Sequence, residues 1–329
     1  MRVPYEELYG ELRRVLLKLG FEVERGEACA RLFAEASRDG VYSHGLNRFP
    51  VFVRMIESGV VRIHERPRPV EALGALERWD GRRGPGNLNA RECMARAIEL
   101  ARANGVGCVA LAETNHWMRG GSYGWQAAEA GCVGVCWTNT LPNLPPWGAA
   151  EARIGNNPLV VAVPRPSGHV VLDMAMSQFS YGALASHRLG GRQLPVEGGF
   201  DAGGNLTRDP AAIEASMRPL PIGYWKGSGL SLVLDMMAAL LSGGRATHQI
   251  EQDLERETGL SQVFIAFAPP AHDGGEFAAR LADEIIESVR GEGDGRVRYP
   301  GERTLETRRE NTERGVPVEP SIWEQVRGM

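Results

Sequence analysis

The chain has 329 residues, 43% hydrophobic and 24% charged, so it has an ordinary globular composition and enough length for two domains. With 37 basic and 41 acidic residues its net charge is −4, and no basic run occurs, which argues against nucleic acid as a partner. No stretch approaches the roughly 18 apolar residues of a membrane-spanning helix, and the start, Met1-Arg2-Val3-Pro4, is unlike a signal peptide.

The N-terminal 60 residues predict a helical region. A first helix begins near Pro4 and ends at Gly20, and a second runs from Glu22 to Arg38, each with an apolar stripe. A third is expected from His44 to Ser58, capped by Ser43 and kinked at Pro50, with one apolar stripe along it. The stripe consists of Leu46, Phe49, Val53 and Ile56.

From Val70 onward, short strands alternate with helices, which predicts an α/β region. Two expected strands, 159–163 and 169–173, are close enough to form a hairpin, which favours a mixed sheet over a parallel one. The other expected elements are helices 88–103, 122–130, 211–216, 228–242 and 276–290, strands 106–111, 133–137 and 261–267, and a charged C-terminal helix, 302–314.

The cysteines and histidines constrain the chemistry. Five cysteines, without a CxxC pair and mostly in apolar runs, predict reduced core residues of a cytoplasmic protein. No histidine has metal-ligand spacing to another histidine or a cysteine, so we expect no metal site. The segment 105–110 matches GxGxxA, but it follows a helix and opens a strand, the reverse of the order in a Rossmann fingerprint.

Three motifs carry candidate chemistry. His44 and Arg48, four residues apart, would share one helix face, where histidine can transfer a proton and arginine can bind a carboxylate; a solvated helix face is the alternative. The loop 115–121 lies between a strand and a helix, where α/β sheets collect ligands, although His116 could simply stabilise a turn. The segment 223–229 places Lys226 before an apolar helix, as an anion site or as an ordinary capped helix.

Several segments together resemble the type-2 malate/L-lactate dehydrogenase family, nearly end to end: 41–50 (VYSHGLNRFP), 115–125 (NHWMRGGSYGW), 136–139 (CWTN), 190–196 (GGRQLPV) and 220–229 (LPIGYWKGSG). The resemblance implies a non-Rossmann α/β fold with a mixed-sheet cofactor domain and a helical lobe built from both chain ends. In residue numbers we expect 1–70 plus 256–329 for the helical, substrate-binding lobe and 71–255 for the cofactor domain. It also implies a homodimer, with the site near the domain and subunit boundary.

The same resemblance implies NAD(P)-dependent reduction of a 2-oxo acid, with members that reduce a diketo sugar acid the most similar. By position, His44 would donate the proton, Arg48 would bind the carboxylate and His116 would line the substrate pocket. The implied cofactor contacts are His169, Val170, Val171, Leu172, Asp173, Met174, Ala175, Trp225, Lys226, Gly301, Glu302 and Arg303.

Several points stay open at this level. Asp173 near a strand end favours NADH by repelling a 2′-phosphate, whereas Arg165 could attract that phosphate, and Asp173 could equally be a cap. The hairpin around Arg165 and the loop 141–144 match the family less well, which leaves the cofactor and the substrate open. Other members reduce other 2-oxo acids or cyclic imines, and a non-catalytic sugar-acid-binding protein is a further alternative. An acidic partner that keeps His44 charged is expected but not identified.

Overall fold

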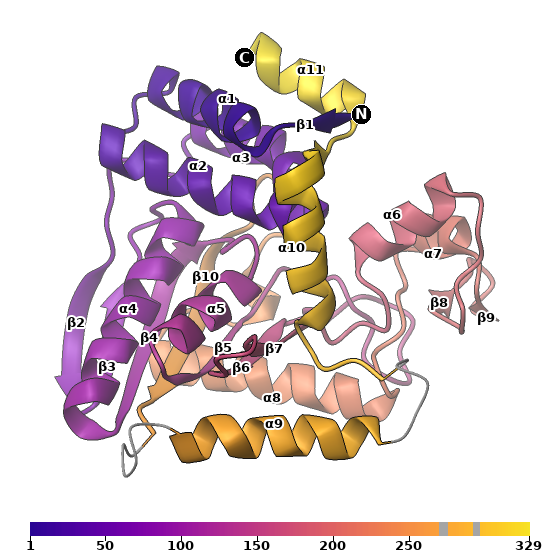
Figure 1. The fold of residues 1–329 in the computed structure, drawn as a ribbon. Helices are drawn as coiled ribbons and strands as arrows, with labels where there is room; N and C mark the ends of the chain where they lie inside the picture. Colours follow the sequence, from indigo (N-terminus) through magenta and orange to yellow (C-terminus); the bar gives the residue numbers. More distant parts are fainter. Residues whose placement is uncertain (270–275, 292–296) are drawn as a thin grey trace.

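A seven-stranded mixed sheet forms the centre of the molecule (Figure 1). The computed structural model describes residues 1–269, 276–291 and 297–329. Among the described strands of this sheet, β3 and β4 form the one parallel pair, and the others run antiparallel to their neighbours. The spatial order is β2 (Arg68–Leu73), β3 (Leu76–Asp80), β4 (Val106–Asn115), β10 (Thr258–Phe267), β5 (Val133–Thr138), β6 (Leu159–Val163) and β7 (Val170–Met174).

Helices cover both faces of the sheet. On one face α4 (Gly86–Asn104) and α5 (Gly121–Glu129) bury an apolar cluster against the strands. On the other face α8 (Trp225–Ser242) packs Leu234 and Ala238 against the sheet, and α9 (Glu276–Arg290) lies on the same side (Figure 1). The mixed α/β architecture expected from the sequence is confirmed, including the β6–β7 hairpin.

The two ends of the chain meet in a helical region. The strands β1 (Arg2–Val3) and β11 (Val316–Pro317) pair with each other. A shared apolar core holds residues from both ends of the chain. Figure 1 shows these helices together above the sheet: α1 (Tyr5–Lys18), α2 (Val23–Arg38), α3 (Phe49–Glu57), α10 (Glu302–Arg314) and α11 (Pro320–Gly328).

The domain boundary at residue 256 requires one correction. We assigned 256–329 to the helical lobe, but β10 lies in the middle of the sheet, where both of its edges are paired. A strand's backbone groups need partners, and here β4 and β5 supply them on both sides. Thr258–Phe267 therefore belongs with the sheet, as does α9, which lies on one of its faces, and the boundary at residue 70 stays a prediction.

A small substructure extends from the sheet domain, and we call it the arm, residues 180–216. It comprises α6 (Tyr181–Leu189), β8 (Gly199–Phe200), β9 (Leu206–Thr207) and α7 (Pro210–Ser216). A small apolar cluster of Leu184, Leu194 and Ile213 stabilises it. The sequence predicted α7 but not α6 or the β8–β9 pair.

The expected helix from His44 to Ser58 is wrong at its start. Two 3₁₀ turns, η1 (Tyr42–His44) and η2 (Leu46–Arg48), precede α3, which begins at Phe49. Pro50 lacks an amide hydrogen, so it fits the first turn of a helix and produces no kink. A Cβ at Gly45 would lie 2.1 Å from the Ser37 hydroxyl, so the chain passes α2 too closely for another residue type. The apolar stripe is confirmed in Leu46, Phe49 and Val53, which are buried.

The helix α8 has only two charged residues, Lys226 and Asp235, in its 18 positions. Within the described residues, neither α8 nor any other helix combines the length and hydropathy needed to cross a bilayer.

Candidate active site

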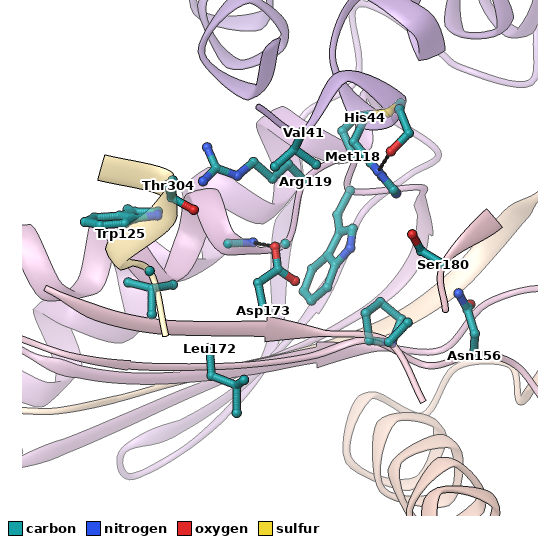
Figure 2. A pocket seen from close by; sticks show the side chains of 18 of the residues that line it. Val41, His44, Met118, Arg119, Trp125, Asn156, Leu172, Asp173, Ser180 and Thr304 are labelled. Atoms are coloured by element: carbon teal, nitrogen blue, oxygen red, sulfur yellow. Dashed lines mark hydrogen bonds between the residues drawn. The ribbon is translucent and has the colours of Figure 1, made fainter. Parts of the chain in front are cut away.

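A cavity of about 410 Å³ lies between the helical region and the β7 end of the sheet (Figure 2). That volume is in the range of small-molecule sites. Segments far apart in the sequence line it: the η1 turn, the loop after β4, strand β7, the start of the arm and the start of α10. Figure 2 shows His44, Ser180 and Asn156 toward one side, Trp125 and Thr304 toward the other, and Asp173 between them.

His44 and His116 form a stacked pair in the wall of this cavity. Their ring centroids are 5.7 Å apart and their planes differ by 23°. The Ser43 hydroxyl lies 2.9 Å from His44 Nδ1, so Ser43 holds the histidine ring and does not cap a helix. His116 Nδ1 accepts a hydrogen bond from the Met118 amide. Each ring is therefore oriented through Nδ1, and Nε2 is the nitrogen left for a ligand.

Both histidines are held in the neutral form in the ligand-free protein. Burial lowers the pKa of His44 to about 4, and the positive charges of Arg48 and Arg119 add to the effect. Burial and the same Arg48 charge also lower the pKa of His116 well below its usual value. The groups that shift the pKa of His44 include two arginines and no acidic residue, so the acidic partner expected for it is not found among them. The surroundings of His44 are positively charged and favour the neutral ring.

Arg48 is not among the residues that line the cavity, but it lies close enough to His44 and His116 for its charge to lower the pKa of both. Its side chain is 15% exposed and pairs with Glu257 at 3.6 Å between Nη2 and Oε2. Its Nε is buried, with no hydrogen-bond partner among the described residues. Glu257 also accepts a hydrogen bond from the Leu141 amide, and burial raises its pKa. Most of the guanidinium donors of Arg48 thus remain available for an anion.

Strand β7 forms the floor of the cavity. Val171, Leu172, Asp173 and Ala175 line it, whereas His169, Val170 and Met174 lie outside the lining. The Asp173 carboxylate is open to the cavity and accepts a hydrogen bond from the Gly121 amide, 2.8 Å away. Desolvation by the surrounding protein raises the pKa of Asp173, although Arg119 and the Gly121 amide lower it. One carboxylate therefore holds the N-terminus of α5 and also faces the ligand space.

Two glycines let the chain pass closely around this floor. A Cβ at Gly121 would lie 2.7 Å from Asp173 Oδ2. Gly301 has φ +96° and contacts the backbone of β7. The chain therefore passes closely around the Asp173 carboxylate, which is placed to accept a hydrogen bond from a ribose hydroxyl of a cofactor.

The charge of Arg165, in the hairpin before β7, is balanced by a carboxylate of α9. Arg165 pairs with Asp283 and stacks on Tyr299, and its side chain is 11% exposed. The His169 ring accepts a hydrogen bond from the Arg165 amide. Because Asp283 already balances its charge, Arg165 is a poor candidate for binding a 2′-phosphate.

Besides His169, Val170 and Met174, four more of the residues assigned to cofactor binding lie outside the cavity lining: Trp225, Lys226, Glu302 and Arg303. Glu302 pairs with Arg290, and Arg303 lines a separate surface hollow with Arg298 and Glu306. Trp225 and Lys226 are exposed in the first turn of α8, which begins three residues earlier than expected. The amides of residues 226 and 227 donate to the carbonyls of residues 223 and 222. Of the two anion-binding features expected there, the Lys226 ammonium remains available and those two amides do not.

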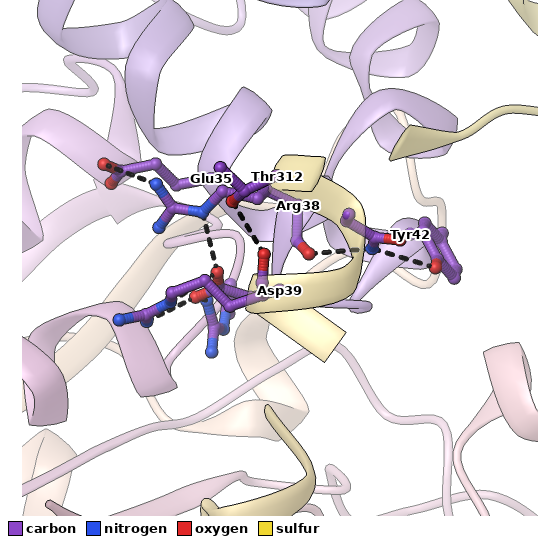
Figure 3. Close-up of polar contacts among 8 residues, drawn as sticks. Glu35, Arg38, Asp39, Tyr42 and Thr312 are labelled. Carbon is purple, nitrogen blue, oxygen red and sulfur yellow. Dashed lines mark hydrogen bonds and ion pairs between the residues drawn. The ribbon is translucent and has the colours of Figure 1, made fainter. Parts of the chain in front are cut away.

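A buried carboxylate joins the helical region to the cavity (Figure 3). Asp39, with 1% of its side chain exposed, accepts hydrogen bonds from Arg38, Arg119 and Arg308 at 2.6–3.0 Å. Burial by itself would raise the pKa of Asp39, but these three arginines outweigh it and hold the pKa at about 2. Arg119 lines the cavity and Arg308 belongs to α10, so Asp39 fixes both against α2.

With this geometry established, comparison with known proteins decides the family. A model of the malate/L-lactate dehydrogenase family matches residues 3–327. The chain belongs to this family. It is an oxidoreductase, and dehydrogenases of this family normally use nicotinamide cofactors.

Relatives within the malate/L-lactate dehydrogenase family are similar over their whole length. The chain is 48% identical over 333 residues to the 2,3-diketo-L-gulonate reductase of Escherichia coli K12, covering all of both chains. Sulfolactate dehydrogenase from Methanocaldococcus jannaschii superposes with a TM-score of 0.91 at 27% identity, over 99% of this chain and 95% of that one. Delta1-piperideine-2-carboxylate reductase from Pseudomonas syringae gives 0.88 at 28%, over 100% and 99%.

Several site residues escaped the sequence analysis. Glu257, Asn156 and Ser180 lie far in sequence from the motifs around His44 and His116, and Asp39 lies just before the first of these motifs. Asp39 precedes the Gly40 turn, and Ser180 caps α6, so each had a local explanation that required no function. Leu141 and Leu144, in a loop expected to face the substrate, are buried in apolar clusters.

Proposed function

We propose that the protein reduces the C2 carbonyl of 2,3-diketo-L-gulonate to give 3-dehydro-L-gulonate, with NADH as the cofactor. The observation that carries this proposal is that His44 lies in the cavity wall with the Arg48 guanidinium near it, and the Arg48 Nε has no hydrogen-bond partner among the described residues. Full-length identity of 48% to reductases of that name supports the choice of substrate. The five cysteines, all within the described residues, are free, which supports a cytoplasmic setting.

His44 and Arg48 divide the work on the substrate. Arg48 binds the carboxylate with its unengaged donors, and this negative charge next to His44 favours protonation of the ring. Protonated His44 then donates through Nε2 to the oxygen at C2, while Ser43 holds Nδ1. His116, fixed by the Met118 amide, lies next to His44 in the wall and orients the reacting carbonyl.

The floor residues would hold the nicotinamide cofactor, which supplies the hydride when bound. Val171 provides an apolar surface, and the open Asp173 carboxylate is suited to accept from a ribose hydroxyl, whereas the Leu172 side chain points to the other face of β7 (Figure 2). A carboxylate there disfavours a 2′-phosphate, and Arg165 is already neutralised by Asp283. These two features support NADH rather than NADPH.

The test of this function is a panel of substrates followed by absorbance at 340 nm. With NADH, we expect 2,3-diketo-L-gulonate to have the highest kcat/KM, ahead of pyruvate, oxaloacetate and Δ1-piperideine-2-carboxylate. Ureidoglycolate oxidation is measured separately with NAD⁺ and should have a lower kcat/KM. Replacing NADH by NADPH should lower kcat/KM for the same substrate. Preference for a cyclic imine or a short 2-oxo acid would assign the protein to another activity of the family, and no turnover at all would contradict the proposal.

We also propose a homodimer, with α8 at the interface. The outer side of α8 presents a continuous apolar surface, and its N-terminal turn carries the exposed Trp225 and Lys226. Surfaces of this kind mark protein contacts. Pairing through α8 would bring these two residues to the subunit boundary, where the family resemblance places the site. The apolar surface consists of Leu230, Leu232, Val233, Met236, Met237 and Leu240.

Light scattering on the purified protein should give about twice the chain mass of 35.9 kDa. Leu240→Glu should shift the mass toward the monomer, because Leu240 is 81% exposed in the single chain and a charge there would be buried in the pair. Leu189→Glu on α6, where leucine is 75% exposed, is the matched control and should leave the mass unchanged. A monomeric wild-type protein with full activity would contradict a site at the subunit boundary.

A further inference from the structure

One side of the cavity carries hydrogen-bond donors that the proposed reaction does not use. Asn156 lies there, on the side of His44 (Figure 2). Its Oδ1 accepts from the Thr140 hydroxyl at 3.1 Å and from the Asn143 amide at 3.0 Å, while its backbone amide donates to Asn143 Oδ1. These contacts fix the amide plane and leave both Nδ2 hydrogens without a partner in the part of the chain that the structure describes.

Ser180 adds a second donor on the same side. As the N-cap of α6 its hydroxyl oxygen accepts from the Ala183 amide at 3.1 Å, and the hydroxyl hydrogen remains to be donated. Ser180 comes from the base of the arm. The next residue, Tyr181, donates to the Asn143 carbonyl, and a Cβ at Gly182 would lie 2.9 Å from Ser43. The arm is thereby held against both the Asn143–Asn156 pair and the His44 turn.

The charged side chains in and near the cavity each have a partner of their own. The Arg48 guanidinium pairs with Glu257, Arg119 pairs with Asp39, and Asp173 lies at the Gly121 amide. Neutral donors on a rigid wall suit neutral acceptors, and hydroxyl groups on a carbon chain are acceptors of this kind. A short apolar 2-oxo acid would leave these donors without a partner when it displaces water.

We propose that Asn156 and Ser180 form a hydroxyl subsite that selects 2-oxo acids with a polyhydroxylated chain beyond the reacting carbons. This inference rests on the proposed function for the identity of the reaction, and it assigns the choice among 2-oxo acids to two residues. Asn156 Nδ2 and the Ser180 hydroxyl donate to hydroxyl oxygens of the chain, corresponding to the C4–C6 hydroxyls of 2,3-diketo-L-gulonate.

The test compares Asn156→Asp, Ser180→Ala and the double variant with the wild type. Asn156→Asp keeps an oxygen for Thr140 and Asn143 and removes the Nδ2 donors. The measured quantity is the ratio of kcat/KM for 2,3-diketo-L-gulonate to kcat/KM for pyruvate, so repulsion between the new carboxylate and both anionic substrates largely cancels. Each single variant should lower this ratio about 3–10-fold, and the double variant further.

A control and a second readout keep the two proposals separate. Asp209→Ala removes the N-cap of α7 in the same arm, away from the cavity, and should leave the ratio unchanged. Calorimetry gives the affinities for L-gulonate and L-lactate, which need no turnover. Loss of the preference for L-gulonate in the variants supports the subsite even where the wild type reduces no diketo acid. Unchanged ratios and an unchanged preference in all three variants overturn the subsite and leave the proposed reaction standing.

Discussion

His44→Ala is expected to lower kcat for reduction by about 10²–10⁴-fold, the usual contribution of a positioned general acid. The substrate KM should change less, because Arg48 and the cavity wall remain. The imidazole lies in the wall of the cavity, its Nδ1 held by Ser43, and the buried apolar stripe of α3 does not depend on it. Circular dichroism should therefore be unchanged while steady-state turnover falls.

The matched control is His187→Ala on α6, where the ring contacts the Ala183 carbonyl and Phe179 outside the cavity. It should leave kcat within about twofold of the wild type, as for a residue outside the reacting groups. If a folded His44→Ala enzyme kept normal turnover, the proton would come from another group. His116 is then the first residue to replace, because it stacks directly on His44.

The pH dependence of the wild type should follow from the same residue. With its pKa lowered to about 4, His44 in the free enzyme is protonated in a fraction that falls tenfold for each pH unit above that value. Since kcat/KM reports the free enzyme, kcat/KM for reduction should decrease as pH rises from 5 to 8. In the oxidation direction neutral His44 acts as the base, and kcat/KM should not decrease for this reason over that range. A reduction profile that rises with pH would contradict the role of His44.

Asp39→Asn should produce the largest loss of stability, about 3–5 kcal/mol in the free energy of unfolding. The substitution keeps the size of the side chain and removes the charge that balances Arg38, Arg119 and Arg308. Arg119 has only 5% of its side chain exposed, so its charge would be left buried without the carboxylate that pairs with it directly. Urea denaturation followed by fluorescence would measure the change.

Glu310→Gln is the matched control on α10. Glu310 pairs with Arg2 at the surface, where 47% of its side chain is exposed, so its loss should cost about 0–1 kcal/mol. The pH dependence separates the two positions further. The pKa of Asp39 in the folded protein, about 2, lies below its usual value, so its contribution is complete above about pH 4 and is lost as pH falls toward 2. Asp39→Asn should remove that part of the acid dependence, and an equal loss in both variants would contradict the role given to Asp39.

The elements that the sequence predicted well carry strong local signals. The helix 302–314 was predicted with its observed bounds, because glycines flank it and charged residues fill it. The β6–β7 hairpin followed from two β-branched runs around a Pro/Gly turn. The turn at His44 was predicted as helix because its apolar residues have helical spacing, and the close passage of Gly45 along α2 is a tertiary contact that spacing does not reveal. The position of β10 between β4 and β5 likewise depends on pairing between strands far apart in the sequence, which local patterns do not reveal.

The site residues also differ in how far the sequence predicted them. The motifs that contain His44, Arg48, His116 and Asp173 were visible because each combines reactive residues with glycines or a strand end. Asp39 pairs with Arg308, which is 269 positions away in the sequence. Glu257 pairs with Arg48 and lies in a segment that contains no recognisable motif. A carboxylate in a helical stretch is usually a surface group. Only its burial in the fold distinguishes Asp39 from Glu35, the carboxylate four residues before it.

The central position of β10 also has a consequence for how the protein is made. The ribosome delivers β4 and β5 first, and the strand that joins them emerges only after the arm and α8 have been completed. Until then each of these strands exposes an unpaired edge toward the other, the feature that promotes association between nascent chains. A translation product that stops before Thr258 therefore lacks the middle strand of its sheet and should be a substrate for chaperones or proteases. The last steps of folding are expected to wait until nearly the entire chain has left the ribosome.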